Sequence, residues 1–121
     1  MTPPIFALAA AATPVRLLLG SDPVRLFPFG DAGESPAMPY AVWQIVGGQP
    51  ANYLAGRPDA DSVTTQIDVY AETEASARAV AIALRDALEL SAYVVSWRGE
   101  TRDATTRIYR SSFDMDWIVR R

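Results

Sequence analysis

The stretch QIDVYAETEASARAVAIALRDAL, residues 66–88, changes its hydrophobic period from two to nearly four within a few residues. A period of two is typical of a strand with two different faces, and a period near 3.6 is typical of an amphipathic helix. Residues 62–71 therefore predict a strand that leads directly into a helix. The apolar face of this strand holds Val63, Ile67 and Val69, and its polar face holds Thr64, Gln66, Asp68 and Tyr70.

The helix after this strand has a clear start and two different sides. The Thr73 hydroxyl is a suitable N-cap, and Glu74 places negative charge at the positive end of the helix dipole. The charged side carries the pairs Glu74–Arg78 and Arg85–Glu89 at i,i+4 spacing, so the opposite side is expected to pack on the sheet. That apolar stripe consists of Ala77, Val80, Leu84, Ala87 and Leu88.

The flanking sequence predicts one further helix and four further extended segments. An Ala-rich helix follows Thr2, its expected cap, and Pro14 ends or kinks it before Gly20 stops it. Gly47 and Gly48 bend or bulge the strand that precedes them and act as turn residues. Extended segments are expected at residues 24–27, 40–48, 92–98 and 107–121, with connections at 28–39, 49–61 and 99–106.

These elements predict an α+β fold in the order α-β-β-β-α-β-β. Two hairpins separated by a crossover helix indicate a mostly antiparallel sheet with helices packed on one face. The last strand alternates for so long that we expect it either to pair with more than one partner or to extend past the sheet edge, where solvated charges would discourage unwanted pairing. A chain of 121 residues can bury a sufficient core as one domain, residues 1–121.

Composition excludes several classes of site. The chain has no Cys and no His, which removes thiolate and imidazole chemistry and the common zinc sites. All eleven basic residues are Arg and the net charge is −3, so a broad cationic surface for nucleic acid is not expected. No catalytic residue, metal site or cofactor site is predicted.

Two groups of carboxylates are candidates for a catalytic or metal site. Asp114 and Asp116 lie about 7 Å apart on one face of a strand, which suits an acid–base or metal pair, but alternate aspartates on a strand are more typical of a solvated face. Asp59 and Asp61, with Asp31 and Glu34 elsewhere, supply oxygen ligands without the spacing of a known cation loop. The three tryptophans, at 43, 97 and 117, are expected in the core or at an interface.

The N-terminal run IFALAAAA, residues 5–12, has two interpretations. It resembles the apolar part of a secretory signal that ends in small residues. It lacks a positively charged region before it and is far shorter than the roughly 20 residues that span a bilayer. We therefore expect an amphipathic first helix and no membrane association.

Nearly the whole chain resembles the tail terminator or tail-completion proteins of long-tailed bacteriophages. The most specific pieces are QIDVYAETEASARAVAIALRDAL and YRSSFDMDWIV, a strand and helix in direct succession and a long final strand. The resemblance implies a structural virion protein of the tail neck, assembled in the host cytoplasm, without enzymatic activity. It implies a homo-oligomeric ring, usually of six subunits, that ends the tail tube and joins it to the head connector.

The partners implied are other copies of the chain, the major tail tube protein and the head connector or head-completion protein. DNA is expected to pass through the ring without specific binding. The alternatives from the residues alone are a non-viral α+β binding or accessory module and, less favoured, a small enzyme.

Candidate interface residues come from expected exposure. Ile82 lies on the charged side of the central helix, where it is either a tolerated apolar residue or a contact. The connection over residues 47–61 is long for a hairpin and is either a flexible tip folded on the core or an arm that reaches a neighbour or the tube. The full candidate set is Tyr53, Leu54, Arg57, Arg78, Ile82, Arg85, Arg110 and Asp114.

Overall fold

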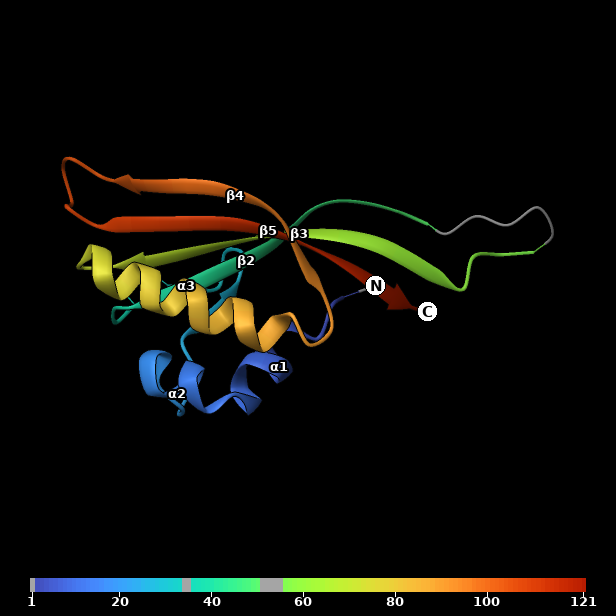
Figure 1. Ribbon diagram of the computed structural model, residues 1–121, viewed down its shortest axis with the longest axis horizontal. Coiled ribbons are helices and arrows are strands. Elements are labelled where there is room, and N and C mark those ends of the chain that lie inside the picture. The colour runs from blue at the N-terminus through green and yellow to red at the C-terminus, as the bar shows by residue number, and fades with distance from the viewer. Residues whose placement is uncertain (1, 34–35, 51–55) are drawn as a thin grey trace.

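The computed structural model describes residues 2–33, 36–50 and 56–121. Over these residues it is an α+β fold, as predicted, in which one sheet carries helices on one side (Figure 1). The elements are α1 (Ile5–Ala11), α2 (Thr13–Leu19), β1 (Leu26–Pro28), β2 (Tyr40–Pro50), β3 (Ala60–Ala71), α3 (Glu74–Leu88), β4 (Tyr93–Arg102) and β5 (Tyr109–Arg120).

The five strands form one sheet in the order β1-β2-β3-β5-β4. The pairs β2–β3, β3–β5 and β4–β5 are antiparallel, and the short β1 pairs with β2 in parallel. The sheet is therefore mixed, with one parallel pair at its edge. The long last strand has two partners, as its length predicted, because β5 lies between β3 and β4.

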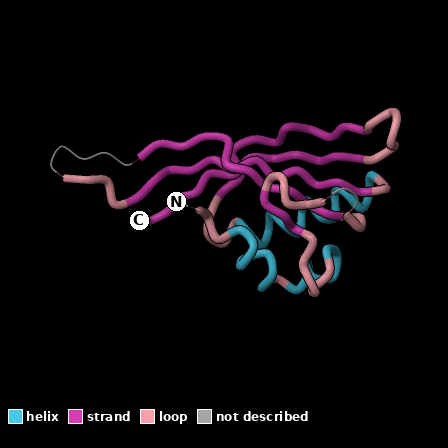
Figure 2. Tube along the Cα trace, turned by 180° about the vertical axis from the view of Figure 1, so that it is seen from behind, coloured by secondary structure: helices cyan, strands magenta, loops and turns pink. Residues whose placement is uncertain are grey.

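All three helices over the described residues lie on the same side of the sheet, as Figure 2 shows. Helix α3 packs on β3 and β5, and α1 and α2 pack on α3. The predicted cap of α3 is confirmed, since the Thr73 side chain accepts a hydrogen bond from the backbone N–H of Ser76. Its predicted apolar stripe is also confirmed and lies in the core. The largest fully buried side chains include Phe113, Ile5, Leu19, Leu26, Ile67 and Leu84.

The N-terminal helix differs from the prediction in its start and its continuity. Pro4 is the N-cap of α1 and no side chain caps it, so the expected cap at Thr2 is wrong. The helix breaks at Ala12, whose backbone is extended, and Pro14 lies in the first turn of the next helix. Proline is suited to the first turn of a helix, because the backbone N–H groups there have no hydrogen-bond partner within the helix and the absence of one costs no bond. Gly20 ends α2 with a φ of 83°, the stop that was predicted.

Strands β2 and β4 continue further than the hydrophobic pattern indicated. β4 runs through Gly99 to Arg102, so only the part of the expected connection that follows it is a turn. β2 includes Gly47 and Gly48, which are strand residues and not turn residues. The predicted bulge is confirmed by the register shift between Ile45 and Gly47. The polar residues at the ends of these two strands show no period-two alternation of hydrophobicity, so the sequence did not indicate that the strands continue. Backbone pairing with the neighbouring strand decides where each strand ends.

Gly48 has a specific steric reason to be glycine, which gives a test of the β2–β3 pairing. A Cβ at this position would lie 2.5 Å from the backbone oxygen of Ser62. Gly48→Ala must therefore shift the backbone, and we expect it to lower the free energy of unfolding by about 1–3 kcal/mol. Gly47→Ala is the matched control, because a Cβ there meets no atom within 4 Å. Equal urea midpoints for the two variants would contradict the packing described.

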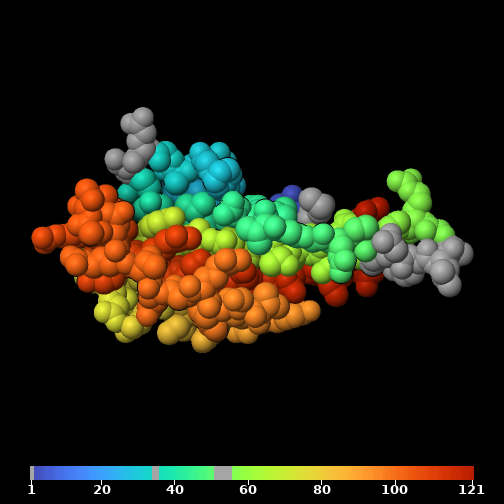
Figure 3. Space-filling model, turned by 90° about the horizontal axis from the view of Figure 1, so that it is seen from above, coloured from blue at the N-terminus to red at the C-terminus, as the bar shows by residue number. Residues whose placement is uncertain are grey.

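The ends of β2, β3 and β5 extend together beyond the helix layer. We call this extension, residues 46–50, 56–63 and 118–121, the arm. In the space-filling view it projects past the orange β4 edge (Figure 3). Within the arm, Arg121 holds the end of β5 against the start of β3, because its backbone N–H donates to the Asp59 carbonyl and its guanidinium pairs with Asp61 at 2.9 Å. The segment expected to be a connection is thus partly sheet.

Candidate functional site

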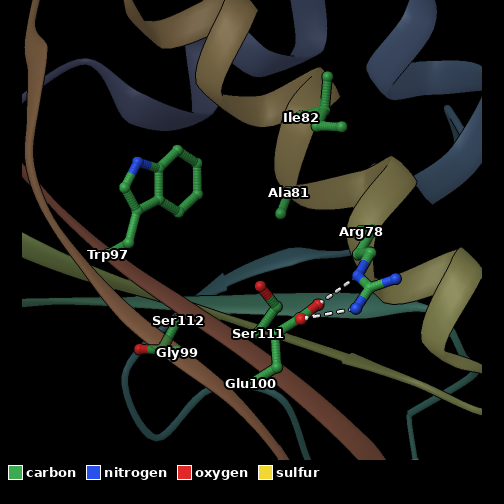
Figure 4. Close-up of a pocket in the computed structure, with 8 residues that line it drawn as sticks. All are labelled: Arg78, Ala81, Ile82, Trp97, Gly99, Glu100, Ser111 and Ser112. Carbon is green, nitrogen blue, oxygen red and sulfur yellow. Dashed lines mark hydrogen bonds and ion pairs between the residues drawn. The ribbon is translucent and has the colours of Figure 1, made fainter.

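A groove lies between α3 and β4, the strand at one edge of the sheet. Its volume is about 270 Å³. Figure 4 shows the Trp97 ring on one side of it and Ala81 and Ile82 on the other, with Ser111 below. The residues that line the groove are Arg78, Ala81, Ile82, Trp97, Gly99, Glu100, Ser111 and Ser112.

The apolar part of the groove is accessible to a partner. The Trp97 side chain is 53% exposed and Ile82 is 47% exposed. The Trp97 ring lies 5.3 Å from the ring of Phe113, which is fully buried, so one of its faces rests on the core. An aromatic ring that is held in place and half exposed is the kind of residue that anchors protein interfaces.

The polar rim of the groove is one arginine between two carboxylates. Nε of Arg78 lies 2.8 Å and its Nη2 lies 3.0 Å from the two oxygens of Glu100. Glu74, one helical turn before Arg78, pairs with the same guanidinium, as the i,i+4 spacing predicted. The hydrogen bond from Arg78 holds the pKa of Glu100 below its ordinary value. The rim therefore keeps two negative charges and one positive charge.

β4 presents an irregular edge beside the groove. Its pairing with β5 shifts between Val94 and Ser96 and again between Trp97 and Gly99. Gly99 has a φ of 97°, a conformation that favours glycine. Bulges interrupt the row of backbone donors and acceptors that a further strand needs, so this edge is better suited to side-chain contacts than to strand addition.

The helix-free face of the sheet carries a second polar arrangement, centred on Asp68. This carboxylate is 7% exposed and accepts hydrogen bonds from Ser112 Oγ and from Gln66 Nε2 at 3.1 Å. Nη2 of Arg110 lies 3.0 Å from the same carboxylate. Gln66, Arg110 and Ser112 thus satisfy a buried charge that would otherwise be costly.

The interpretation of Asp114 and Asp116 as solvated residues is wrong for Asp114. Asp114 is buried, and Nε of Arg98 lies 2.8 Å from its Oδ1. This bond raises the pKa of Arg98 above its ordinary value. Asp116 is half-buried and accepts from the Thr64 hydroxyl. Long side chains from neighbouring strands cover this face, and the two carboxylates do not act as a pair.

The acidic residues considered as oxygen ligands for a cation, a site that the sequence does not favour, form no such group in the part of the chain that the structure describes. Asp61 is paired with Arg121, and this hydrogen bond holds the pKa of Asp61 below its ordinary value. Glu34 lies outside the described residues. Within residues 2–33, 36–50 and 56–121 there is no group of three acidic, His or Cys side chains with the geometry of a metal site. Across the same residues, no helix has the length and apolar character needed to cross a bilayer.

The candidate residues from the sequence that the structure describes fall in four places. Arg78 and Ile82 line the groove, and Arg110 and Asp114 belong to the helix-free face. Arg85 lies further along α3, where it pairs with Asp86 and Glu89. Arg57 is exposed on the arm. Tyr53 and Leu54 lie outside the described residues.

Trp97 is the groove residue that sequence reasoning did not place. Its expected location was the core or an interface, without a choice between them. Trp97 lies opposite Phe113 on an edge strand, so one side of its ring has no neighbouring strand. This position depends on the strand order and cannot be predicted from the local sequence pattern.

Comparisons with known proteins agree with the fold. The sequence model of the family described as "Tail completion protein gp17" matches residues 3–120, which confirms the resemblance noted in the sequence. A chain in the solved structure titled "Virion of native gene transfer agent (GTA) particle" is similar in fold, with a TM-score of 0.69 and 14% sequence identity over 97% of this chain and 92% of that chain. A comparison with curated proteins finds no match.

Proposed function

Because the chain belongs to the tail completion protein gp17 family, we propose that it forms a ring, with six subunits, that ends the tail tube. The family identifies the chain as a structural protein of a phage-like tail, and its location is the virion, as predicted. In our proposal the ring occupies the neck. There it contacts the major tail tube protein on one side and the head connector or head-completion protein on the other.

The observation that carries the ring is the presence of two different surfaces at separate places on one subunit. A ring needs a heterologous contact, in which one patch of a subunit meets a different patch of the next. The groove beside β4 and the projecting arm are such a pair of surfaces. A projecting arm and an accessible aromatic anchor both favour assembly over a solitary subunit.

The helix-free face is compatible with passage of DNA without tight binding. Two arginines of its central part, Arg98 and Arg110, are each engaged by a buried carboxylate, Asp114 and Asp68. Guanidinium groups that are already paired attract phosphate weakly, and the net charge of −3 disfavours broad DNA contact.

The proposal includes no catalysis. The chain has neither His nor Cys, so the usual nucleophile and base pairs are missing from the sequence. The two aspartates that were considered for acid–base work each have a separate hydrogen-bond partner. The family assignment also favours the virion role over the non-viral binding module that the residues alone left open.

The ring proposal is tested by native mass spectrometry of the purified protein over a concentration series, together with electron microscopy of tails. We expect a six-subunit species that increases with concentration, and density for the protein at the end of the tube. Tails made without the protein are the control and should lack this density. A protein that stays monomeric at every concentration and is absent from tail ends would overturn the proposal.

A further inference from the structure

We propose that the arm of one subunit docks into the α3–β4 groove of the adjacent copy, with Ile118 as the inserted side chain and Arg120 on the acidic rim. This inference rests on the proposed ring and names the two surfaces that meet in it. Four observations support it: the apolar character of the groove, the composition of the arm, the charges of the two surfaces and the geometry of β5.

The groove is lined by a group of exposed apolar side chains and not by a single one. Trp97 and Ile82 are each about half exposed, and Val95, in the same edge strand, is 47% exposed. Isolated apolar residues are common on surfaces, but a concave group around a half-exposed Trp is typical of an interface. The occupant therefore has to supply an apolar side chain.

The arm presents such a side chain next to a cation. Ile118 is 71% exposed and lies on the helix-free face of β5. Arg120 is two residues further along the same strand, so it projects from the same face. Among the described residues Arg120 has no ion pair closer than 4.0 Å, whereas Arg121 is paired with Asp61.

The charges of the two surfaces are complementary. The exposed side of α3 and the rim of the groove hold five carboxylates and two guanidinium groups, which leaves three negative charges, equal to the net charge of the whole chain. The side chains of the arm hold three guanidinium groups and two carboxylates and are net positive. The residues counted on α3, at its two ends and on the groove rim are Glu72, Glu74, Arg78, Arg85, Asp86, Glu89 and Glu100, and the arm residues are Arg57, Asp59, Asp61, Arg120 and Arg121.

An arm that fills the groove has to come from another copy, because a subunit cannot fill its own groove with its own arm. Trp97 lies opposite Phe113 on β5, and Ile118 is five residues further along that strand, or about 17 Å at the usual rise per residue. Phe113 faces the helices, whereas Ile118 lies on the opposite face of the sheet. A contact between Ile118 and the groove is therefore a contact between subunits.

The contact is expected to use side chains and not a shared sheet. The two bulges in β4 interrupt its free edge on either side of Trp97. A strand added there would lose backbone hydrogen bonds at both irregular positions. An apolar side chain in the groove and a guanidinium near Glu74 and Glu100 need no such regular edge.

Disulfide cross-linking gives a direct test because the natural chain has no Cys. We expect Ile82→Cys/Ile118→Cys to form an oxidised ladder of covalent oligomers up to the ring, since a disulfide needs the two Cα atoms within about 7 Å. The matched control is Leu17→Cys/Ile118→Cys, in which the first position is 80% exposed on α2, outside the groove. The control should give no such ladder.

A charge exchange is the second test of this contact. Glu100→Arg should weaken ring formation by about tenfold, because it places like charges opposite Arg120, and Arg120→Glu in the same chain should restore assembly. Asp31→Arg, which makes the same change of charge at an exposed position outside the groove and the arm, should leave ring formation close to that of the natural protein. Circular dichroism and urea unfolding check that each variant is folded.

The outcomes separate this inference from the ring itself. Rings that form normally without the Ile82–Ile118 ladder, or without rescue by Arg120→Glu, would overturn the docking and leave the ring proposal intact. A cross-link from Ile82→Cys to the tail tube protein in place of a second copy would assign the groove to that partner and also overturn it. If the natural protein forms no ring on tail ends, both proposals are wrong.

Discussion

Phe113→Ala is expected to lower the free energy of unfolding by about 3–5 kcal/mol, the usual cost of truncating a buried aromatic residue. Phe113 is fully buried in the central strand β5, opposite Ile67 on one side and Trp97 on the other. Truncation leaves a cavity between the sheet and α3 and also removes the support under the Trp97 ring. Urea unfolding followed by far-UV circular dichroism measures the loss.

The matched control for this prediction is Trp97→Ala. This substitution removes a larger side chain, but one that is 53% exposed, so it should cost clearly less stability than Phe113→Ala. Ring formation should be affected in the opposite order. At equal amounts of folded protein, Trp97→Ala should weaken it more than Phe113→Ala does, because Trp97 faces the partner in the proposed contact. A Phe113→Ala variant that loses less than about 1 kcal/mol would show that β5 is not the centre of the core.

Asp68→Ala is expected to lower the free energy of unfolding by about 1–3 kcal/mol, because buried groups are left without a partner. The substitution removes the acceptor for the Ser112 hydroxyl, the Gln66 amide and the Arg110 guanidinium. Arg110 is 41% exposed in its side chain and can turn to water, which keeps the cost below that of a fully buried pair. Ser112 is buried and has no such alternative.

Asp116→Ala is the comparison for Asp68→Ala, because it removes a carboxylate from the same face of the sheet with a single hydrogen-bond donor, Thr64. We expect it to cost less than Asp68→Ala in the same urea experiment. Asp68→Asn should fall between the two, since one acceptor oxygen remains. Equal stability of Asp68→Ala and Asp116→Ala would mean that the Asp68 network contributes little to folding.

The candidate site could be predicted in part from the sequence. Arg78 and Ile82 were identified because a helical wheel separates the exposed side of α3 from its buried side. The wheel also placed the Glu74–Arg78 pair, which is present. The second wall of the groove comes from β4, which is distant in sequence. Glu100 was assigned to a connection, and Trp97 was given no specific place, so the groove could not be recognised.

For the polar residues of the helix-free face, too, the sequence predicted only part of the arrangement. Period-two alternation correctly assigned Asp68 to the polar face of β3 and Asp114 to the polar face of β5. It also suggested solvated charges, but both carboxylates are buried. Their burial depends on Arg98, Arg110 and Gln66, which reach them from other positions in the sheet. Alternation indicates the face on which a residue lies but does not indicate the neighbours that cover it.

The sequence by itself determined the elements whose signals are local: the Thr73 cap, the buried stripe of α3, the two faces of β3 and the long alternation of β5. Only the tertiary structure decided the order β1-β2-β3-β5-β4, the parallel pairing of β1, the bulges in β4 and the groove at Trp97. Propensity and periodicity act between residues a few positions apart. Strand order and register arise from contacts between distant segments, such as Thr64 with Asp116, and these are decided when the whole core packs.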